Sequence, residues 1–554
     1  MDGLMMDQPL LLSDLLWRTE RLFHDKKIVT YLEAGSYHSY TYADFAKRVR
    51  RLSSALVKLG VRPGERVGTI AWNHYRHFET YLGIPGSGAV VHTINMRLFP
   101  EQQQYIINHA GDSVLIVDED QIPLIEQVAE LGIPSVRAFV VMGDKPLPDT
   151  ALAPIYRYED LIADGDEDYE FPVLDERTAA AMCYTSATTG EPKGVVYSHR
   201  AMVLQTMCLA MHDKLNMSES QVWLEVSPMF HVNGWNIPHT ALMQGATLVF
   251  PGVRPTAGDY VQIVQDQKIT GMNGAVTIGT MMRDFIRSSS QEWDLSSLKT
   301  MWLGGQAPSR AIMEWWERYG TCVVQGYGST ENTPQVCFSS IKSTLANGSP
   351  EDIYALRQKQ GQPIPLMKIK IMSDNGLELP WDGRSAGELW VQSPFTASAY
   401  YNDVRTKEHM QDGWFHTGDV GCIDPDGYVV IMDRVKDLIK SGGEWISSID
   451  LENALAAHPK VREATVIAIP DEKWLERPLA CVVADDKSLS EADLRAFLAE
   501  RFAKWWIPDS FLIVDTIPKT SVGKFNKKEL RALYSENGMR GIEQHLEIVQ
   551  DTVA

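Results

Sequence analysis

The segment 184–194 carries the residue types best suited to a chemical role. It reads Tyr-Thr-Ser-Ala-Thr-Thr-Gly-Glu-Pro-Lys-Gly, with hydroxyl residues crowded before Gly190 and with Lys193 and Gly194 at its end. The apolar stretches Ala179–Tyr184 and 195–197 on either side predict strands. A loop of this composition directs backbone N–H groups, hydroxyls and one cation toward one point, as the oxygens of a polyphosphate require. Its spacing differs from the nucleotidase P-loop, and taken alone the segment is equally well explained as a turn.

A second polar cluster follows the short apolar strand predicted at 322–324. It consists of Gln325, Gly326, Tyr327, Gly328, Ser329, Thr330 and Glu331. The tyrosine between glycines offers an aromatic face for a purine, and Thr330 and Glu331 add a hydroxyl and a carboxylate. A carboxylate near phosphates usually holds Mg²⁺, which prefers oxygen ligands. The structural alternative is a strand-to-loop turn capped by the Thr-Glu pair.

Three further segments have weaker signals. Asp419, just before the Asp-Pro-Asp-Gly turn at 424–427, could accept hydrogen bonds from both ribose hydroxyls, although an aspartate that only shapes a turn is the simpler explanation. The charged stretch 433–446 contains the pair Gly442 and Gly443, which would let a ligand or another chain approach closely, or it is a solvated linker. Lys524 lies on a turn near the C-terminus, where a lysine is usually solvated.

The order of the predicted elements indicates parallel α/β sheets. Strand-like apolar runs alternate with segments of helical periodicity between residues 40 and 141, and again between 202 and about 324. Such an alternation gives a parallel sheet covered by helices. After residue 362, short strands and Gly/Pro/Asp turns predict a small β-rich subdomain. Beyond it we predict a compact α+β unit, in which Ser488 and Glu491 form a capping box for a helix at 491–502.

Length and composition limit the classes of protein that fit. A chain of 554 residues is too long for one ordinary core, so we expect a large N-terminal domain at 1–432 and a small C-terminal domain at 433–554. The net charge of −20 disfavours nucleic acid or an anionic membrane as a partner. The six cysteines form no CxxC pair, and neither a signal peptide nor a transmembrane segment is evident, so we expect a cytoplasmic protein.

Taken together and in this order, the segments resemble the adenylate-forming superfamily of acyl-CoA synthetases, luciferases and peptide-synthetase adenylation domains. Residues 228–235 (Pro-Met-Phe-His-Val-Asn-Gly-Trp) and 440–447 (Lys-Ser-Gly-Gly-Glu-Trp-Ile-Ser) most resemble bacterial medium- and long-chain fatty acyl-CoA synthetases. The resemblance implies a two-step reaction, in which ATP and a carboxylate give an acyl-adenylate and diphosphate, and the thiol of coenzyme A then displaces AMP. It also implies Mg²⁺, a mobile C-terminal domain that turns about a hinge at Asp433, and a homodimer formed through the N-terminal domain.

The resemblance further implies roles for individual residues. Lys524, Glu331, Thr188 and His231 would be catalytic, and Thr188 and Glu331 would hold the metal. The nucleotide would be bound by Thr185, Ser186, Ala187, Thr188, Thr189, Gly190, Lys193, Gly305, Gln306, Ala307, Gln325, Gly326, Tyr327, Gly328, Thr330, Asp419, Arg434, Lys440 and Lys524. The acyl pocket would include His231, Val232, Trp235, Thr277 and Gly279, although His231 could equally be a buried structural histidine and Trp235 a core residue. The coenzyme A channel would be lined by Lys440, Ser441, Gly442, Gly443, Glu444 and Trp445.

One departure from the family pattern leaves two alternatives open. Ala187 stands where the family usually has glycine, so the loop is strained or crowded if that position needs a positive φ, and merely stiffened if it does not. A protein that binds nucleotide or acyl-adenylate without turnover is therefore one alternative to a fatty acyl-CoA synthetase. The other is the same chemistry on an aryl, short-chain or sulfur-containing acid.

Overall fold

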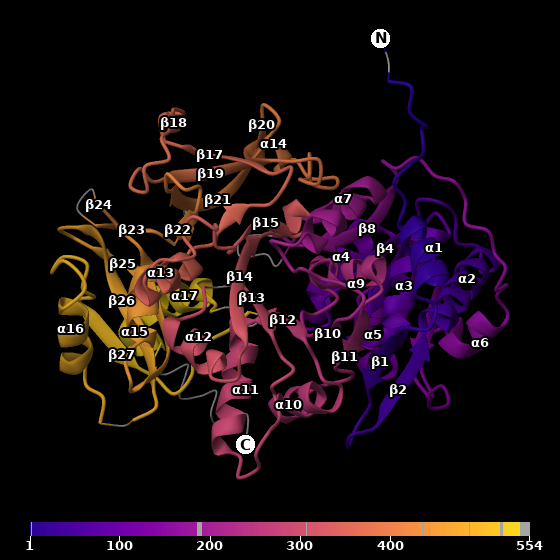
Figure 1. Cartoon of the computed structure of the whole chain (residues 1–554), viewed down its shortest axis with the longest axis horizontal. Helices are drawn as coiled ribbons and strands as arrows, with labels where there is room; N and C mark the ends of the chain where they lie inside the picture. The colour runs from indigo at the N-terminus through magenta and orange to yellow at the C-terminus, as the bar shows by residue number, and fades with distance from the viewer. Residues whose placement is uncertain are drawn as a thin grey trace.

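The computed structural model describes residues 1, 3–185, 191–305, 307–434, 437–441, 444–486, 488–520 and 525–542. Figure 1 shows the N-terminal half of the chain on one side, a sheet of short strands above the centre, and the C-terminal residues packed on the opposite side. None of the helices in these ranges is long and apolar enough to cross a membrane.

The first sheet carries the loop at 184–194. It has seven strands in the order β7-β6-β5-β3-β4-β8-β9, all parallel except β9, which runs antiparallel to β8. Its strands are β3 (Arg66–Ile70), β4 (Val90–Thr93), β5 (Asp112–Asp118), β6 (Ala138–Met142), β7 (Ile155–Arg157), β8 (Ala179–Tyr184) and β9 (Gly194–Ser198). The predicted alternation over 40–141 is therefore confirmed.

The second sheet carries the cluster at 325–331. It has nine strands in the order β16-β15-β14-β13-β12-β10-β11-β1-β2, with a parallel centre and antiparallel edges. Its strands are β1 (Lys27–Tyr31), β2 (Tyr37–Thr41), β10 (Val222–Glu225), β11 (Thr247–Phe250), β12 (Gly271–Ala275), β13 (Thr300–Gly304), β14 (Cys322–Gly328), β15 (Gln335–Phe338) and β16 (Gln362–Pro363).

Helices fill the space between the two sheets and cover their outer faces. One buried apolar cluster joins α1 (Leu12–Leu22), α2 (Tyr42–Lys58), α3 (Tyr75–Gly86), α7 (His199–Ala210) and α9 (Ile237–Gln244) to residues of both sheets. A second cluster includes α4 (Pro100–Ala110) and α5 (Ile122–Glu130) on the first sheet, and a third includes α10 (Ala257–Asp266), α11 (Val276–Ser288) and α12 (Arg310–Glu317) on the second. The remaining helices of this part are η1 (Glu119–Gln121), α6 (Tyr158–Ala163), α8 (Val232–Trp235), η2 (Thr330–Asn332) and α13 (Pro350–Gln358).

The β-rich subdomain predicted after residue 362 is the third sheet, with the order β18-β17-β19-β21-β20 and β22 paired to β21. Its elements are β17 (Lys368–Met372), β18 (Glu378–Leu379), β19 (Gly387–Gln392), α14 (Thr406–His409), β20 (Met410–Gln411), β21 (Trp414–Ile423) and β22 (Val429–Arg434). Antiparallel pairing sets Asp419 on β21 directly opposite Arg434 on β22.

The C-terminal unit is α+β, as expected. Its sheet has the order β24-β23-β26-β25 with β27 beside β26, and its elements are β23 (Ile439–Ser441), β24 (Glu444–Ile446), α15 (Ser448–Ala456), β25 (Val461–Asp471), β26 (Leu475–Ala484), α16 (Glu491–Ala499), β27 (Ser510–Ile513) and α17 (Lys527–Asn537). The predicted capping box is wrong in register: Ser490 caps α16 and pairs with Asp493. The α/β fold class is confirmed, while the division at residue 433 stays a proposal.

One helix start and one hairpin differ from the sequence-based expectation. The helical segment expected from residue 40 is preceded by β2 and begins only at Tyr42, where Thr41 and Asp44 form a capping box. The hairpin of β1 and β2 was not predicted, because β2 lies at a sheet edge and its mostly half-buried residues mix polar and aromatic types. Within the alternation expected between 202 and about 324, α11 begins at Val276, and its first turn lines the pocket described below.

Candidate active site

A β-hairpin holds the two ends of the polar loop. The backbone N–H of Thr185 donates to the Lys193 carbonyl over 2.9 Å, and the Lys193 N–H donates to the Thr185 hydroxyl over 3.2 Å. Beneath these bonds Tyr184 pairs with Gly194 across β8 and β9. Ser186, Ala187, Thr188, Thr189 and Gly190 lie outside the described residues. These hydrogen bonds therefore hold the two ends of the loop close together.

The Lys193 ammonium lies against two residues that the sequence did not point to. Its Nζ is 3.0 Å from Nε2 of His409, at the end of α14, and 4.4 Å from the ring centroid of Tyr400. Burial lowers the pKa of Lys193, and the nearby Glu331 carboxylate opposes that effect. Neither His409 nor Tyr400 belongs to a recognisable motif, since they follow Lys193 by more than 200 residues and meet it only through the fold.

Glu331 and Thr330 lie on η2, immediately after β14. The Tyr400 hydroxyl donates to Glu331 Oε1 over 2.6 Å, and the Tyr197 hydroxyl donates to the Thr330 carbonyl over 2.7 Å. Tyr400 therefore contacts both Lys193, through its ring, and Glu331, through its hydroxyl. The fold brings the proposed phosphate lysine and the proposed metal ligand to the same aromatic side chain.

Tyr327, Asp419 and Arg434 meet at the end of the second sheet and the edge of the third. The Tyr327 hydroxyl donates to Asp419 Oδ2 over 2.5 Å, and Arg434 Nε lies 3.1 Å from Asp419 Oδ1. Burial and the Asp419 charge raise the pKa of Tyr327 well above its usual range, so its hydroxyl stays a donor. The Asp419 charge likewise raises the pKa of Arg434. Asp419 is 5% exposed, and its buried charge is stabilised by the Tyr327 hydroxyl and the Arg434 guanidinium.

These residues line a large cleft between the N-terminal part and the C-terminal unit. Its wall on the N-terminal side includes Gly305, Ala307, Gln325, Gly326, Tyr327, Gly328, Asp419 and Arg434. The Gln325 side-chain amide donates to the carbonyl oxygens of Arg357 and Lys359, so it braces the strand end. Gln306 lies outside the described residues.

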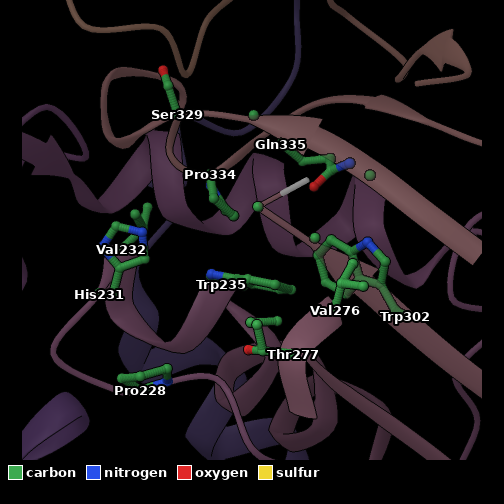
Figure 2. A pocket seen from close by; sticks show the side chains of 15 residues that line it. Pro228, His231, Val232, Trp235, Val276, Thr277, Trp302, Ser329, Pro334 and Gln335 are labelled. Atoms are coloured by element: carbon green, nitrogen blue, oxygen red, sulfur yellow. The ribbon is translucent and has the colours of Figure 1, made fainter. Parts of the chain in front are cut away.

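The proposed acyl residues come together in a second, smaller pocket, shown in Figure 2. His231, Val232, Trp235 and Thr277 all line it, and Trp235 extends across its middle between Pro334 and Thr277. Gly279 does not line it: a side chain there would meet Leu303, Met301 and Trp316 in the core behind α11.

An unusual backbone presents His231, Val232 and Trp235 to this pocket. Five consecutive residues have positive φ: Val232 (46°), Asn233 (53°), Gly234 (61°), Trp235 (52°) and Asn236 (59°). The left-handed conformation costs about 1–2 kcal/mol of free energy per non-glycine residue, so the surrounding packing has to stabilise this turn. The Asn236 side-chain amide supports the turn by donating to the Met202 carbonyl and the Thr206 hydroxyl.

The small pocket adjoins the large cleft. Val276, Thr277, Gly305, Gly326 and Gly328 line both. A ligand with one end in the small pocket could therefore place its other end beside Tyr327. Adjacent subsites of this kind suit a reaction that joins a nucleotide to a second molecule.

The C-terminal unit presents one of its two proposed functional segments to the cleft. Lys519, Thr520, Phe525, Asn526 and Lys527 line the cleft, so the described residues on both sides of Lys524 face the N-terminal wall. Lys524 itself lies outside the described residues. Lys440 and Ser441 on β23 are not among the cleft residues; the Lys440 N–H donates to Glu476 and the Ser441 hydroxyl accepts from Arg477. Gly442 and Gly443 lie outside the described residues, and Glu444 and Trp445 pair with β23 through their backbone.

Asp433 connects the two parts of the chain. Its Oδ2 accepts hydrogen bonds from the N–H and hydroxyl of Ser448, the first residue of α15, at 3.0 and 2.5 Å. It is 1% exposed, and burial raises its pKa despite the nearby Lys527 ammonium. Its position, on the last strand of the N-terminal part and bonded to the first helix of the C-terminal unit, suits a hinge.

The residues fit a nucleotide-bound magnesium ion. No group of three or more His, Cys, Asp or Glu side chains that could hold a metal occurs among the residues the structure describes. Mg²⁺ is commonly held by one or two carboxylates together with substrate phosphates, without an all-protein cage. Glu331 supplies one such carboxylate close to Lys193.

Comparison with known proteins agrees with this geometry. Residues 16–401 match the AMP-binding enzyme family, and residues 450–524 match the AMP-binding enzyme C-terminal domain. The chain is 43% identical to a long-chain-fatty-acid–CoA ligase of Thermus thermophilus, over 96% of each chain. It is 42% identical to a 3-methylmercaptopropionyl-CoA ligase of Ruegeria lacuscaerulensis, over 96% of this chain and 98% of that one. The crystal structure of the anthranilate CoA ligase AuaEII with anthranoyl-AMP superposes with a TM-score of 0.84 at 26% identity, covering 96% of this chain and 98% of that chain.

The chain therefore belongs to the AMP-binding enzyme family, and the resemblance that its motifs indicate is confirmed. It is an adenylate-forming acyl-CoA synthetase, an acid–thiol ligase.

Proposed function

We propose that the protein activates an aliphatic carboxylic acid of the fatty-acid class with ATP and transfers the acyl group to coenzyme A. The observation that carries this proposal is that the small pocket adjoins the cleft at Thr277, Gly305 and Gly326, which line both. An acyl chain in the pocket would bring its carboxylate to the cleft, where the α-phosphate of ATP has to meet it. Relatives that act on long-chain and medium-chain fatty acids support the substrate class.

The chemistry assigned to the cleft residues follows from charge. A carboxylate is a poor electrophile, and its reaction with ATP brings two anions together, so cations have to lower the barrier. Lys193 and the loop at 185–190 would bind the β- and γ-phosphates, and Lys524 would bridge the carboxylate and the α-phosphate. Glu331 and Thr188 would hold Mg²⁺, which supplies positive charge at the phosphates when bound.

The remaining contacts would orient the nucleotide. Asp419 and Arg434 would hold the ribose, Tyr327 would stack on adenine, and Gly305 and Ala307 would leave room for the purine. Thr330 would contact the α-phosphate. His231, at the start of the left-handed turn, would close the acyl pocket next to the carboxylate.

The second half-reaction would need a different arrangement of the C-terminal unit. In the structure the described residues on either side of Lys524, such as Thr520 and Phe525, line the cleft, which suits adenylate formation. A rotation at Asp433 would replace it with Lys440, Ser441 and the rest of the 440–445 loop, which would line the path of the coenzyme A thiol. We further propose a cytoplasmic homodimer; all six cysteines are free, as expected of a reducing compartment.

A second substrate class remains a candidate because of the small pocket itself. Trp235 packs edge-on against Trp302, with ring centroids 5.1 Å apart, and both rings line the pocket. A short acid, such as the thioether acid used by the Ruegeria relative, would fit in front of these rings.

Release of diphosphate and AMP with ATP, Mg²⁺ and coenzyme A tests the proposal across straight-chain acids from acetate to palmitate, benzoate and a thioether acid. Acid-dependent release that peaks at medium or long chains supports the fatty-acid class. A peak at the thioether, short-chain or aryl acid replaces the substrate and keeps the reaction. Lys524→Ala should abolish diphosphate release yet preserve thiolysis of supplied acyl-adenylate. Absence of acid-dependent release from a folded protein that binds ATP would instead favour the non-turnover binding protein that Ala187 leaves open.

A further inference from the structure

Arg405 connects the third sheet to the main chain beside Lys193. It immediately precedes α14, and its Nη1 donates to the Glu191 carbonyl over 2.9 Å. Glu191 lies two residues before Lys193 and is the first residue that the structure describes after 186–190. Arg405 and Glu191 are 214 positions apart in the sequence, so only the fold brings them together. Arg405 therefore fixes the main chain on one side of the lysine.

A backbone hydrogen bond fixes the chain on the other side of Lys193. The Tyr401 N–H donates to the carbonyl of Gly194, the first residue of β9, over 2.8 Å. Tyr401 and Arg405 lie four residues apart in the segment that leads into α14. The Lys193 ammonium itself lies against His409, at the end of α14. One short segment of the third sheet thus holds the lysine by its main chain on both sides and by its side chain.

Asp403 holds the Arg405 guanidinium in place. Arg405 Nε lies 2.9 Å from both carboxylate oxygens of Asp403, and Nη2 donates to the same carboxylate. These hydrogen bonds hold the pKa of Asp403 below its usual range, and its side chain is only 7% exposed, so little water competes for it. A planar guanidinium fixed along one edge presents its next N–H in a set direction, which a lysine ammonium cannot do. The pair therefore directs one donor at the Glu191 carbonyl.

We propose that Arg405 is a positioning residue for ATP: it fixes the main chain at Glu191 and thereby the direction of the Lys193 ammonium. This inference rests on the proposed function, because it takes Lys193 to bind the β- and γ-phosphates. Asp403 balances the charge of Arg405, so the guanidinium acts through the chain and not as a separate cation for the phosphates. Without Arg405, ATP has to order the main chain at Glu191 itself, and fixing one residue corresponds to about a tenfold loss of affinity.

AMP is the matched ligand for the test, because it lacks the β- and γ-phosphates. Titration calorimetry with Mg²⁺ gives the Kd of ATP and the Kd of AMP for the unmodified protein and for Arg405→Ala. The ratio of the ATP Kd to the AMP Kd should rise about tenfold in the variant, through weaker binding of ATP alone. An unchanged ATP affinity, or an equal rise in both Kd values, would overturn the inference.

Two milder substitutions separate positioning from a direct contact between the guanidinium and a phosphate. Asp403→Asn removes the anion that holds Arg405. If Arg405 acts by position, this variant should bind ATP more weakly, whereas tighter binding would show that a freed cation reaches the phosphates and would overturn the inference. Arg405→Lys keeps the charge without the planar fork, and should bind ATP as weakly as Arg405→Ala. Full recovery of the affinity in Arg405→Lys would likewise contradict it.

Arg137→Ala is the matched control. Arg137 also joins a carboxylate, that of Glu65, to a backbone carbonyl, that of Gly60. It precedes β6, whereas Lys193 follows β8, so the two lie at opposite edges of the parallel first sheet. The ratio should stay at its unmodified value in Arg137→Ala, and a rise there as large as in Arg405→Ala would overturn the inference.

Lys193→Ala separates this inference from the proposed function on which it rests. The variant should raise the ratio of the two Kd values at least as much as Arg405→Ala. A raised ratio in Lys193→Ala with an unchanged ratio in Arg405→Ala would overturn the role of Arg405 alone. An unchanged ratio in Lys193→Ala would instead refute the phosphate contact assigned to Lys193 in the proposed function, and the role of Arg405 with it.

Discussion

The contact between Lys193 and His409 leads to a quantitative prediction for ATP binding. A lysine carries about 2 kcal/mol of side-chain rotamer entropy, which is lost when a phosphate immobilises its ammonium group. Here the ammonium is already held 3.0 Å from His409 Nε2 and over the Tyr400 ring, so much of that loss occurs before ATP arrives. An ammonium has three donors, so one bond to His409 leaves two for phosphate oxygens.

His409→Ala should therefore weaken ATP binding. Without the ordering that His409 provides, ATP has to immobilise the lysine itself, which costs about 1–2 kcal/mol, or about a 5- to 30-fold rise in the Kd of ATP. Titration calorimetry with ATP and Mg²⁺ in the absence of acid measures this directly. The KM for the acid at saturating ATP should stay within about twofold, because His409 lines neither the cleft nor the acyl pocket.

Two variants control for a general effect on the third sheet. His409→Gln keeps a side-chain acceptor and should recover part of the ATP affinity. His416→Ala removes a neighbouring histidine that stacks on Trp390, with ring centroids 3.6 Å apart, and should leave the affinity unchanged. An ATP affinity that is unchanged or tighter in His409→Ala would refute the reasoning, since the histidine would then compete with the phosphates for the lysine.

Three further changes probe other parts of the structure. Tyr327→Phe removes the 2.5 Å bond to Asp419 and should raise the KM for ATP about tenfold, with the KM for the acid unchanged; a change in both KM values would contradict a role confined to the nucleotide. Asp433→Ala removes both bonds to Ser448 and should slow acid-dependent ATP–diphosphate exchange several-fold while sparing thiolysis of supplied acyl-adenylate; equal loss of both would rule out a hinge that favours one orientation. Burial lowers the pKa of His239 to about 3 from 6.5, so the folded state resists protonation: its contribution to stability is complete above pH 6.5 and is lost as the pH falls toward 3. At pH 5 this residue should lower the free energy of unfolding by about 2 kcal/mol relative to pH 7. Urea midpoints at pH 7 and pH 5 measure this loss, which should be smaller in His239→Phe. An equal loss in the variant would show that the histidine ring is hydrated in the folded state.

The sequence predicted those parts of the fold that local patterns determine. Alternating apolar runs located the central strands of both large sheets, because buried parallel strands are apolar throughout. The edge hairpin of β1 and β2 was not predicted from the sequence, because the half-buried residues of β2 mix polar and aromatic types. The capping box of α16 was misplaced because Ser488 and Ser490 are both followed three residues later by an acid, and only the burial of Leu494 and Leu498 selects the register.

The candidate site could be predicted where a motif carries it. Tyr327, Asp419 and Arg434 were expected from the family resemblance, and the fold brings them into direct contact. Tyr400 and His409 could not be predicted, because their position beside Lys193 depends on how the third sheet packs on the first. Thr277 and Gly279 were assigned to the acyl pocket together, but only Thr277 lines it, because Gly279 faces Leu303 and Met301 in the core behind α11.

The alternation of side chains along β22 connects the proposed hinge at Asp433 to the proposed nucleotide contacts. Consecutive strand residues point to opposite faces, so Asp433 reaches Ser448 on α15 while Arg434 reaches Asp419 in the cleft. Rotation of the C-terminal unit about Asp433 has to break the bonds to Ser448, but the pairing of β21 with β22 keeps Arg434 opposite Asp419. We therefore expect the AMP moiety to stay bound by the same ribose contacts in both half-reactions, because only residues beyond Arg434 need to change place. On this reasoning Arg434→Ala should impair adenylate formation and thiolysis alike, whereas Asp433→Ala should affect mainly the first.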